Sequence, residues 1–411
     1  MRFALPSPGT GFAAWGRKAT ATLAGAALIA ACATSCSKGI SSTDVASPSP
    51  SGQDISSLAT TVATSDGTWA TVAMGQLSQP LNTFWQLLFR PTGATSWTDQ
   101  VKATAVATNG GLVLASSQGK SLIVGVRPTN LLTFSPLIDT FDGGHTWTNG
   151  LLPYGLGAYP SALAAGPSGR SLALTDAPTS AAGQSVLDSE HLSSWQTLVS
   201  RRDLAASGAG QACSVAALTA VAFEGKVPAI GARCVHSGVV GLLAPSHGSW
   251  RLVGPALPES LRAGSVSVMA LEPTSEGLSC LLTVTGPFGS RVLAAWSGDS
   301  GQTWRLSQPI RLSASEAVRS IGSVGTSGLF VLLADSSGPA RAEVVSGQAA
   351  PWTALPTPPI GTETLAFGPG TTVEALAVSA AVLTVWSLGP NSSGWHKGQV
   401  MQVPIDYGSS S

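Results

Sequence analysis

The chain has 411 residues, and its 21 basic and 21 acidic side chains cancel. Only 10% of its residues are charged, against roughly 25% in average proteins. Such a composition lacks the charged faces of a helical bundle and the basic excess of a nucleic-acid-binding protein. The 47 glycines and 27 prolines, set among many serines, threonines, valines and leucines, favour short strands joined by frequent turns. We therefore predict an all-β protein that binds no nucleic acid.

The N-terminus has the pattern of a secretion signal. Arg2, Arg17 and Lys18 precede an uncharged run over 19–31, which ends at Cys32. This run is too short to cross roughly 30 Å of hydrocarbon as a helix. The pattern therefore predicts a cleaved signal peptide over 1–31 rather than a retained membrane span.

The residues directly before Cys32 are Ile29, Ala30 and Ala31. They resemble a bacterial lipobox, and this resemblance implies that a peptidase cleaves before Cys32 and that the cysteine thiol takes a diacylglycerol group. Two acyl chains on one residue give stable anchoring. We therefore expect the protein to be lipid-anchored on the extracytoplasmic face of the cell membrane. The alternatives are a weaker match at Cys36 and an ordinary secreted protein.

A linker is expected between the anchor and the folded part. Residues 32–53 are rich in Ser, Pro, Gly and Thr and contain few apolar side chains, as flexible tethers do. Without residues 1–31 the chain keeps 18 basic and 21 acidic residues, a net charge of −3. We expect the folded part to span 54–404, followed by a disordered tail over 405–411.

Tryptophans recur along the folded part at intervals of 43 to 55 residues. They are Trp97, Trp147, Trp195, Trp250, Trp304, Trp352 and Trp395. A second marker alternates with them, a glycine expected between the first and second strands of each unit: Gly67, Gly110, Gly169, Gly225, Gly277, Gly328 and Gly370. Two markers with this period predict seven units of the size of a propeller blade.

An eight-residue pattern that ends in one of these tryptophans occurs twice. The copies are Thr140, Phe141, Asp142, Gly143, Gly144, His145, Thr146, Trp147 and Ser297, Gly298, Asp299, Ser300, Gly301, Gln302, Thr303, Trp304. The aspartate can accept hydrogen bonds from turn amides, and the fifth residue, a glycine, can take a positive φ. Both copies resemble the Asp-box, or BNR repeat, of sialidases and related β-propellers. In that family the motif closes the turn between the third and fourth strands of a blade.

The period and the resemblance together predict a seven-bladed β-propeller of four-stranded antiparallel blades. A pair of β-sandwiches also uses short strands and regular turns, but it does not explain one period along the whole chain. Two ways of closing the ring stay open. Residues 400–404 complete the last blade alone, or the segment near Asp54 lends it a strand.

Cys213 and Cys234 lie on either side of Gly225, hence on two adjacent expected strands of an exported protein. We predict a disulfide between them, with Cys234 to Cys280 as the alternative pairing. The cysteines and histidines do not have the spacing of zinc ligands. Neither Asp-box turn carries more than one carboxylate for calcium. We expect no metal and no cofactor.

The Asp-box resemblance also raises sialidase activity as an alternative. Sialidases hold the sugar carboxylate with three arginines and use a tyrosine nucleophile, a helping glutamate and an acidic proton donor. Arg90 and Arg127 lack the family's Arg-Ile-Pro context, and the tyrosines Tyr154, Tyr159 and Tyr407 lie in a loop or in the tail. The acidic candidates stand singly: Glu224, Glu272, Glu343 and Glu374. We therefore assign no catalytic residue.

The organisation is similar to that of seven-bladed Asp-box propellers of the photosystem assembly-factor type, which act as binding and assembly scaffolds. This resemblance implies a lipid-anchored, non-enzymatic propeller that binds a protein or glycan partner at one mouth of the ring. The alternatives are a sialidase-type glycoside hydrolase and a structural cell-wall protein without a defined ligand.

Overall fold

The computed structural model divides the chain into two units, 1–53 and 54–411. It describes residues 58–75, 83–100, 110–116, 119–127, 136–152, 159–176, 183–192, 194–275, 277–325, 327–335, 341–347, 350–368 and 372–403, all in the second unit. The predicted signal peptide, Cys32, the linker, the tail, Tyr154 and Tyr407 lie outside the described residues. No helix in the described ranges is long and apolar enough to cross a membrane.

The described residues form mainly short strands, and four consecutive strands at a time pair antiparallel into what we call a run. The first run is β1 (Ala59–Thr64), β2 (Gly67–Gly75), β3 (Thr83–Pro91) and β4 (Thr98–Asp99). The next is β5 (Leu112–Ser116), β6 (Leu122–Val126), β7 (Pro136–Thr140) and β8 (Thr148–Leu151). Then come β9 (Tyr159–Ala165), β10 (Ser171–Asp176), β11 (Ser185–Ser189) and β12 (Trp195–Ser200).

The second half of the chain repeats this arrangement. It contains β13 (Val215–Glu224), β14 (Val227–Cys234), β15 (Gly241–Ser246) and β16 (Ser249–Leu252), then β17 (Ser265–Thr274), β18 (Gly277–Gly286), β19 (Gly289–Ser297) and β20 (Arg305–Leu306), with β21 (Ile310–Arg311) also paired to β19. The last runs are β22 (Glu316–Val324), β23 (Gly328–Asp335), β24 (Arg341–Val345) and β25 (Thr353–Ala354), and β26 (Thr362–Phe367), β27 (Val373–Ser379), β28 (Val382–Leu388) and β29 (His396–Gln402). The predicted all-β class is confirmed.

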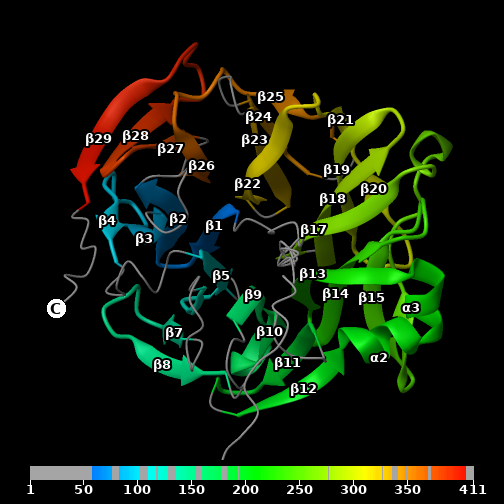
Figure 1. The fold of residues 1–411 in the computed structure, drawn as a ribbon. Helices are drawn as coiled ribbons and strands as arrows, with labels where there is room; N and C mark the ends of the chain where they lie inside the picture. Colours follow the sequence, from blue (N-terminus) through cyan, green and yellow to red (C-terminus); the bar gives the residue numbers. More distant parts are fainter. Residues whose placement is uncertain are drawn as a thin grey trace, which may run out of the picture. The chain divides into compact units, whose positions relative to one another are not determined.

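Figure 1 shows the runs around a common centre, with the first strand of each run nearest to it. Buried apolar clusters fill the space between neighbouring runs. Leu137 packs with Leu163 between β5–β8 and β9–β12, for example. Another cluster, with Leu88 and Leu376, joins the last run to the first. Within this unit the sheets therefore form a closed ring.

The strands inside the ring are covered by a neighbouring sheet on each face, which explains why they lack a strict alternation of polar and apolar residues. In β2 every residue from Trp69 to Met74 is buried, whichever face it points to. Two further pairings tie runs together. β1 pairs in parallel with β22, and the end of β14 pairs with the start of β17.

The two ends of the chain do not share a sheet where the ring closes. All four strands of the last run, β26–β29, come from the C-terminal segment, and β1 belongs to the first run. The side-chain amide of Gln399 accepts a hydrogen bond from the N–H of Trp97 at 2.7 Å and donates one to its carbonyl at 2.8 Å. Glu374 accepts a hydrogen bond of 2.8 Å from Trp97 Nε1 and forms an ion pair with Arg90. Polar and apolar contacts thus hold the last run against the first, and we call this contact the seam.

Two short helices, α2 (Arg201–Ala206) and α3 (Gly208–Cys213), lie between β12 and β13 and were not predicted. Serines cap both. Ser200 accepts a hydrogen bond from the N–H of Asp203, and Ser207 accepts one from the N–H of Gly210, each at 3.1 Å. Single 3-10 turns occur at η2 (Pro167–Gly169) and η3 (Glu259–Leu261).

The predicted glycine marker is wrong in the second run. Gly110 precedes β5, whereas the turn between β5 and β6 contains Gly119. Gly119 lies 52 residues after Gly67 and 50 before Gly169, which fits the common period better than the 43 and 59 residues that Gly110 gives. Gly370 lies outside the described residues. The other marker glycines lie in or beside the expected turns: Gly67, Gly169, Gly225, Gly277 and Gly328.

Candidate functional site

A cleft of about 760 Å³ opens between the β5–β8 run and the β9–β12 run. Its volume falls within the roughly 300–1,000 Å³ of small-molecule sites. Lys120, Phe141, Ser168 and His191 border it. They belong to the turns that join first to second and third to fourth strands in both runs.

One wall of the cleft is a cross-strand row in the β5–β8 run. Ile123 lies opposite Asp139, and Asp139 lies opposite Thr148. Side chains alternate along a strand, and Leu137, two residues before Asp139, packs with Leu163 of the neighbouring run. Asp139 therefore points to the same side, into the cleft that it lines.

The carboxyl group of Asp139 is unusual for its place in the fold, because the residue is only 4% exposed. Burial raises the pKa of this carboxyl, and a hydrogen bond from its own backbone opposes the rise. No lysine or arginine in the described ranges forms an ion pair with it. Burying a carboxylate without a partner is unfavourable, so Asp139 is suited to accept hydrogen bonds from a bound ligand.

The opposite wall contains η2 and the start of β10. Arg170 does not supply a free charge here, because its guanidinium binds Asp188 through two hydrogen bonds of 3.0 and 2.7 Å. Ser171 and Ser189 are cross-strand partners on β10 and β11. Ser168 and Ser171 line the cleft, whereas Ser189 does not. This wall therefore presents hydroxyl groups rather than cations.

The rim of the cleft carries an exposed aromatic ring. Phe141, which follows β7, is 58% exposed. Lys120 lies at the rim as well, where its mostly exposed side chain forms a 3.5 Å ion pair with Asp66. The imidazole of His191 is in the turn between β11 and β12. A ligand in the cleft would thus meet an aromatic face at the entrance and a carboxylate at depth.

Phe141 belongs to the first of the two repeated turns, which lies between β7 and β8. Thr140 Oγ1 accepts a 2.9 Å hydrogen bond from the N–H of Gly144. Asp142 accepts one from the N–H of Thr146 at 2.9 Å and one from its hydroxyl at 2.6 Å. The aspartate and the threonine thereby close the turn on itself.

The second repeated turn, between β19 and β20, has the same bonds. Ser297 Oγ accepts from the N–H of Gly301 at 2.9 Å. Asp299 accepts from the N–H and the hydroxyl of Thr303 at 2.8 and 2.6 Å. The N–H of Ser300 also donates to Glu224 of an earlier run at 2.9 Å. This turn is therefore tied to a neighbouring sheet.

The hydrogen bonds in these turns favour the ionised aspartates. Those from Thr146 lower the pKa of Asp142 to about 2, and those from Thr303 lower the pKa of Asp299. Both carboxylates are therefore charged at neutral pH and already occupied by the turn. We assign them a structural role and no contact with a ligand.

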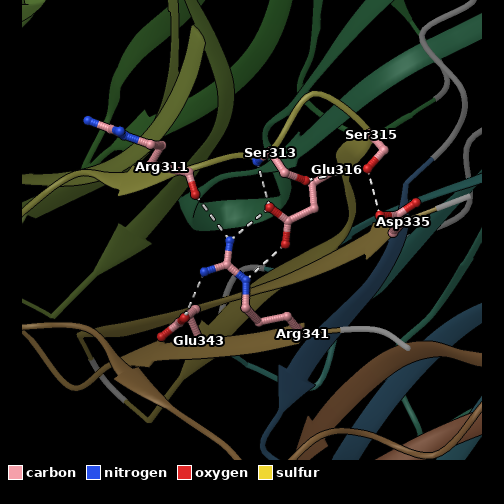
Figure 2. A network of polar contacts seen from close by, with 7 residues as sticks. All are labelled: Arg311, Ser313, Ser315, Glu316, Asp335, Arg341 and Glu343. Carbon is pink, nitrogen blue, oxygen red and sulfur yellow. Dashed lines mark hydrogen bonds and ion pairs between the residues drawn. The ribbon is translucent and has the colours of Figure 1, made fainter. Parts of the chain in front are cut away.

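A separate polar network, shown in Figure 2, surrounds Arg341 at the start of β24. The guanidinium donates to both carboxylate oxygens of Glu316 at 2.9 and 3.1 Å, to Glu343 at 3.4 Å and to the carbonyl of Arg311 at 3.2 Å. The N–H of Ser313 donates to Glu316 at 2.8 Å. The network joins the start of β22 to β24.

The two glutamates of this network differ in pKa. Burial acts to raise the pKa of Glu316, but hydrogen bonds from Ser313 and Arg341 outweigh it and the net shift is downward. Burial raises the pKa of Glu343, and the charge of Arg341 only partly opposes this. Because protein groups already bind both oxygens of Glu316, we interpret the network as a structural contact that stabilises the packing of β22 and β24.

The structure joins Cys213 to Cys234 by a disulfide and leaves Cys280 as a buried free thiol. This is the predicted pairing, but the predicted placement on two strands is wrong. Cys213 is the last residue of α3, and only Cys234 ends a strand. Burial raises the pKa of Cys280, which keeps this thiol protonated and unreactive.

The sialidase alternative requires arginines that are free to bind a sugar carboxylate. Four arginines instead bind carboxylates of the protein, in three different runs: Arg90 with Glu374, Arg170 with Asp188, Arg319 with Glu363 and Arg341 with Glu316. Arg127 lies over the ring of Tyr159 at 5.1 Å. Four of these five arginines are therefore already occupied by carboxylates of the protein, and the fifth lies on an aromatic ring.

No protein-family model matches the sequence, and no curated protein matches it. Solved structures do resemble it. The periplasmic gluconolactonase of Pseudomonas aeruginosa has a TM-score of 0.50 and 15% identity, over 81% of this chain and 95% of its own. The fold is a β-propeller. At this identity the similarity concerns the propeller fold alone.

Two further propellers are similar at lower scores. YCF48 from Cyanidioschyzon merolae has a TM-score of 0.46 and 14% identity, over 82% of this chain and 97% of its own. The fucose-binding lectin of Aleuria aurantia, described as a six-bladed propeller, has a TM-score of 0.40 and 14% identity, over 84% of this chain and 95% of its own.

The cleft of this propeller was missed from the sequence. The sequence predicted a site at one mouth of the ring, which stays a prediction, and the cleft lies between two neighbouring sheets. One signal was available. Asp139 is a lone carboxylate in the apolar strand just before the first repeated turn, where a buried acid is rare unless paired.

Proposed function

We propose that the protein is a lipid-anchored, extracytoplasmic β-propeller that binds a protein or glycan partner in the cleft between the β5–β8 and β9–β12 runs. The anchor part of the proposal rests on the signal pattern and Cys32. The proposed role is that of a non-enzymatic binding or assembly scaffold, supported by the arginines Arg90, Arg170, Arg319 and Arg341, which carboxylates of the protein already bind.

The proposal includes a seven-bladed ring in which the two repeated turns are Asp-boxes. Support comes from seven sets of four consecutive strands in the described residues, each with a tryptophan at or just before its fourth strand. The matching hydrogen bonds of Asp142 and Asp299 support the motif. An experimental density map viewed along the ring axis would count the blades, and six would contradict this part.

The observation that carries the binding function is the buried carboxylate of Asp139 in a cleft of about 760 Å³. The side chains around a cavity of this size lack the dispersion contacts that they would make in a fully packed interface between the sheets. The uncompensated carboxylate adds a desolvation cost. Both costs are removed when a ligand with hydrogen-bond donors occupies the cleft.

Filling the cleft tests this function. Thr148 is exposed, begins β8 and lines the cleft, so Thr148→Trp in the full chain should block ligand entry without loss of the fold. Thr353→Trp is the matched control, because Thr353 is exposed and begins β25 in another run. We expect quantitative affinity capture from solubilised envelope to lose a partner with the first variant only. Equal recovery by wild type and both variants would contradict the cleft as the binding site.

The anchor has its own test. Cys32→Ser should release the protein from the membrane fraction into the soluble envelope or medium. Continued membrane retention of this variant would contradict the lipid anchor and leave the cleft prediction intact.

A further inference from the structure

We propose that the ligand of the cleft is a neutral sugar unit of a glycan, whose hydroxyl groups bind Asp139 and whose apolar ring face stacks on Phe141. This inference rests on the proposed function, in which the cleft is the ligand site. It adds the chemical class of the ligand and the role of each residue.

The charge of the cleft excludes acidic sugars. Asp139 is the buried ionisable group of the wall, and its carboxylate repels a second carboxylate. Arg170 cannot compensate, because two hydrogen bonds hold its guanidinium on Asp188. Lys120 is exposed at the rim and pairs with Asp66. A sialic acid would therefore place its carboxylate against the wrong charge, whereas a neutral sugar would not.

The other lining groups match a polyhydroxylated ring. Ser121, Thr148 and Ser171 line the cleft with hydroxyls, and Ile123 and Leu192 line it with aliphatic groups. A pyranose has the complementary pattern, with hydroxyls around its edge and an apolar C–H face. An ammonium ion would use the carboxylate alone and would leave the exposed ring of Phe141 without a role.

The state of Asp139 supports this assignment. The carboxylate of Asp139 accepts a hydrogen bond from its own backbone but has no counter-charge among the described residues, and burial raises its pKa. Hydroxyl donors from a sugar stabilise the ionised form, so binding lowers that pKa and releases protons where the free carboxyl is partly protonated. Neutral-sugar affinity should therefore fall as the pH decreases through the pKa of Asp139.

The test uses methyl glycosides of glucose, galactose, mannose, fucose and N-acetylglucosamine, with N-acetylneuraminic acid as the acidic probe, against the full chain. Ligand-observed NMR detects binding, and titration calorimetry measures it. We expect at least one neutral glycoside to bind and the acidic sugar not to. Asp139→Asn removes a charge-assisted hydrogen bond, and Phe141→Ala removes an aromatic contact. Each should therefore weaken that binding about tenfold or more.

Two control variants change the same residue types elsewhere. Phe288→Ala removes an aromatic ring that is 76% exposed in the turn between β18 and β19, and Glu259→Gln neutralises an exposed carboxylate in η3. Both should bind the sugar like wild type. Binding that is unchanged in Asp139→Asn and Phe141→Ala, or binding of the acidic sugar alone, would overturn the assignment.

The outcomes separate this inference from the proposed function. Suppose that Thr148→Trp abolishes capture of a partner but enzymatic removal of its glycans does not, and no neutral glycoside binds. The cleft is then the site and the ligand class is wrong. If Thr148→Trp changes neither capture nor glycoside binding, the cleft itself is wrong and both proposals fail.

Discussion

Trp304 donates a hydrogen bond of 2.6 Å from its indole Nε1 to the carbonyl of Val253 in the preceding run. The same bond recurs from Trp352 to Gln308 and from Trp395 to Pro356, at 2.9 and 3.1 Å. Each acceptor lies three or four residues after the tryptophan of the run before. In these runs the indole of one sheet is therefore held on the backbone of its neighbour.

Gly301 is required at this contact for two reasons. Its φ is +78°, and a Cβ added to it would lie 2.7 Å from the carbonyl oxygen of Val253. We expect Gly301→Ala to lower the free energy of unfolding by more than about 2 kcal/mol, from left-handed strain and the clash together. Gly289→Ala is the control, because Gly289 has φ +91° with open space around it. It should cost only about 1–2 kcal/mol. Equal losses in urea unfolding would contradict the role of the close approach.

Glu374 should be critical for the seam between the last run and the first. The side chains of Arg90 and Glu374 are only 5% and 11% exposed. Glu374→Gln keeps the shape but leaves the Arg90 guanidinium buried without a counter-charge, which typically costs about 3–5 kcal/mol. We expect a lower free energy of unfolding by that amount in urea. Glu259→Gln, at an exposed carboxylate, should change it little. A stable Glu374→Gln variant would show that the ion pair does not hold the seam.

The repeated turns predict a specific acid response. The pKa of Asp142 is lowered from 3.8 to about 2 in the folded state. Its stabilising contribution is therefore complete above pH 4 and is lost as the pH falls towards 2. We expect the thermal midpoint of wild type to fall more steeply between pH 4 and pH 2 than that of Asp142→Asn.

Asp139 should change the stability of the fold with pH in the opposite direction, and it serves as a control. Because burial raises its pKa, ionisation of Asp139 destabilises the fold as the pH rises above the unfolded value of 3.8. Asp139→Asn should therefore be at least as stable as wild type at neutral pH. Parallel pH profiles for the two aspartate variants would contradict both assignments.

The cysteines allow a direct chemical check. Alkylation of the native protein without reductant, followed by peptide mapping, should find Cys213 linked to Cys234 and Cys280 unmodified until the protein is denatured. The double variant Cys213→Ser with Cys234→Ser should lose about 3 kcal/mol of stability, as expected for a disulfide that spans 21 positions. Cys280→Ala leaves the disulfide intact and serves as the control. A Cys234–Cys280 linkage in the map would contradict the pairing.

The propeller fold could be predicted because its main requirements repeat along the chain. A tryptophan such as Trp304 must be covered by the preceding sheet, and Asp299 needs Thr303 four residues later to close the turn. The aspartate and the threonine are local in sequence and occur together in two runs, and the tryptophan recurs in each of the seven runs of the described residues. The residues that satisfy them therefore form a pattern that can be counted.

The helical insert could not be predicted from the same pattern. Ser200 and Asp203 form an N-terminal capping arrangement, but α2 has only six residues. A segment this short has little helical preference of its own. The tertiary contacts of Leu204 and the disulfide at Cys213 accompany it in the structure, and neither can be read from local sequence.

The cleft also depends on features far apart in the chain. Small residues of two runs line it, with Gly150 from one run and Ala165 and Gly166 from the other. The distance between two sheets follows from all the side chains that separate them. Asp139 could be recognised as an isolated acid, but its position opposite this gap required the fold.

The side-chain amide of Gln399 binds both the N–H and the carbonyl of Trp97. This contact between the two ends of the chain has a consequence for biosynthesis. The first sheet leaves the ribosome long before β29, which is the last strand to be made. The side of that sheet formed by Leu88 and Trp97 is covered mostly by β26–β28, and Met401 and Val403 complete the cover. A nascent chain that stops before β26 therefore exposes this apolar face, and degradation or chaperone capture of such fragments follows from the topology.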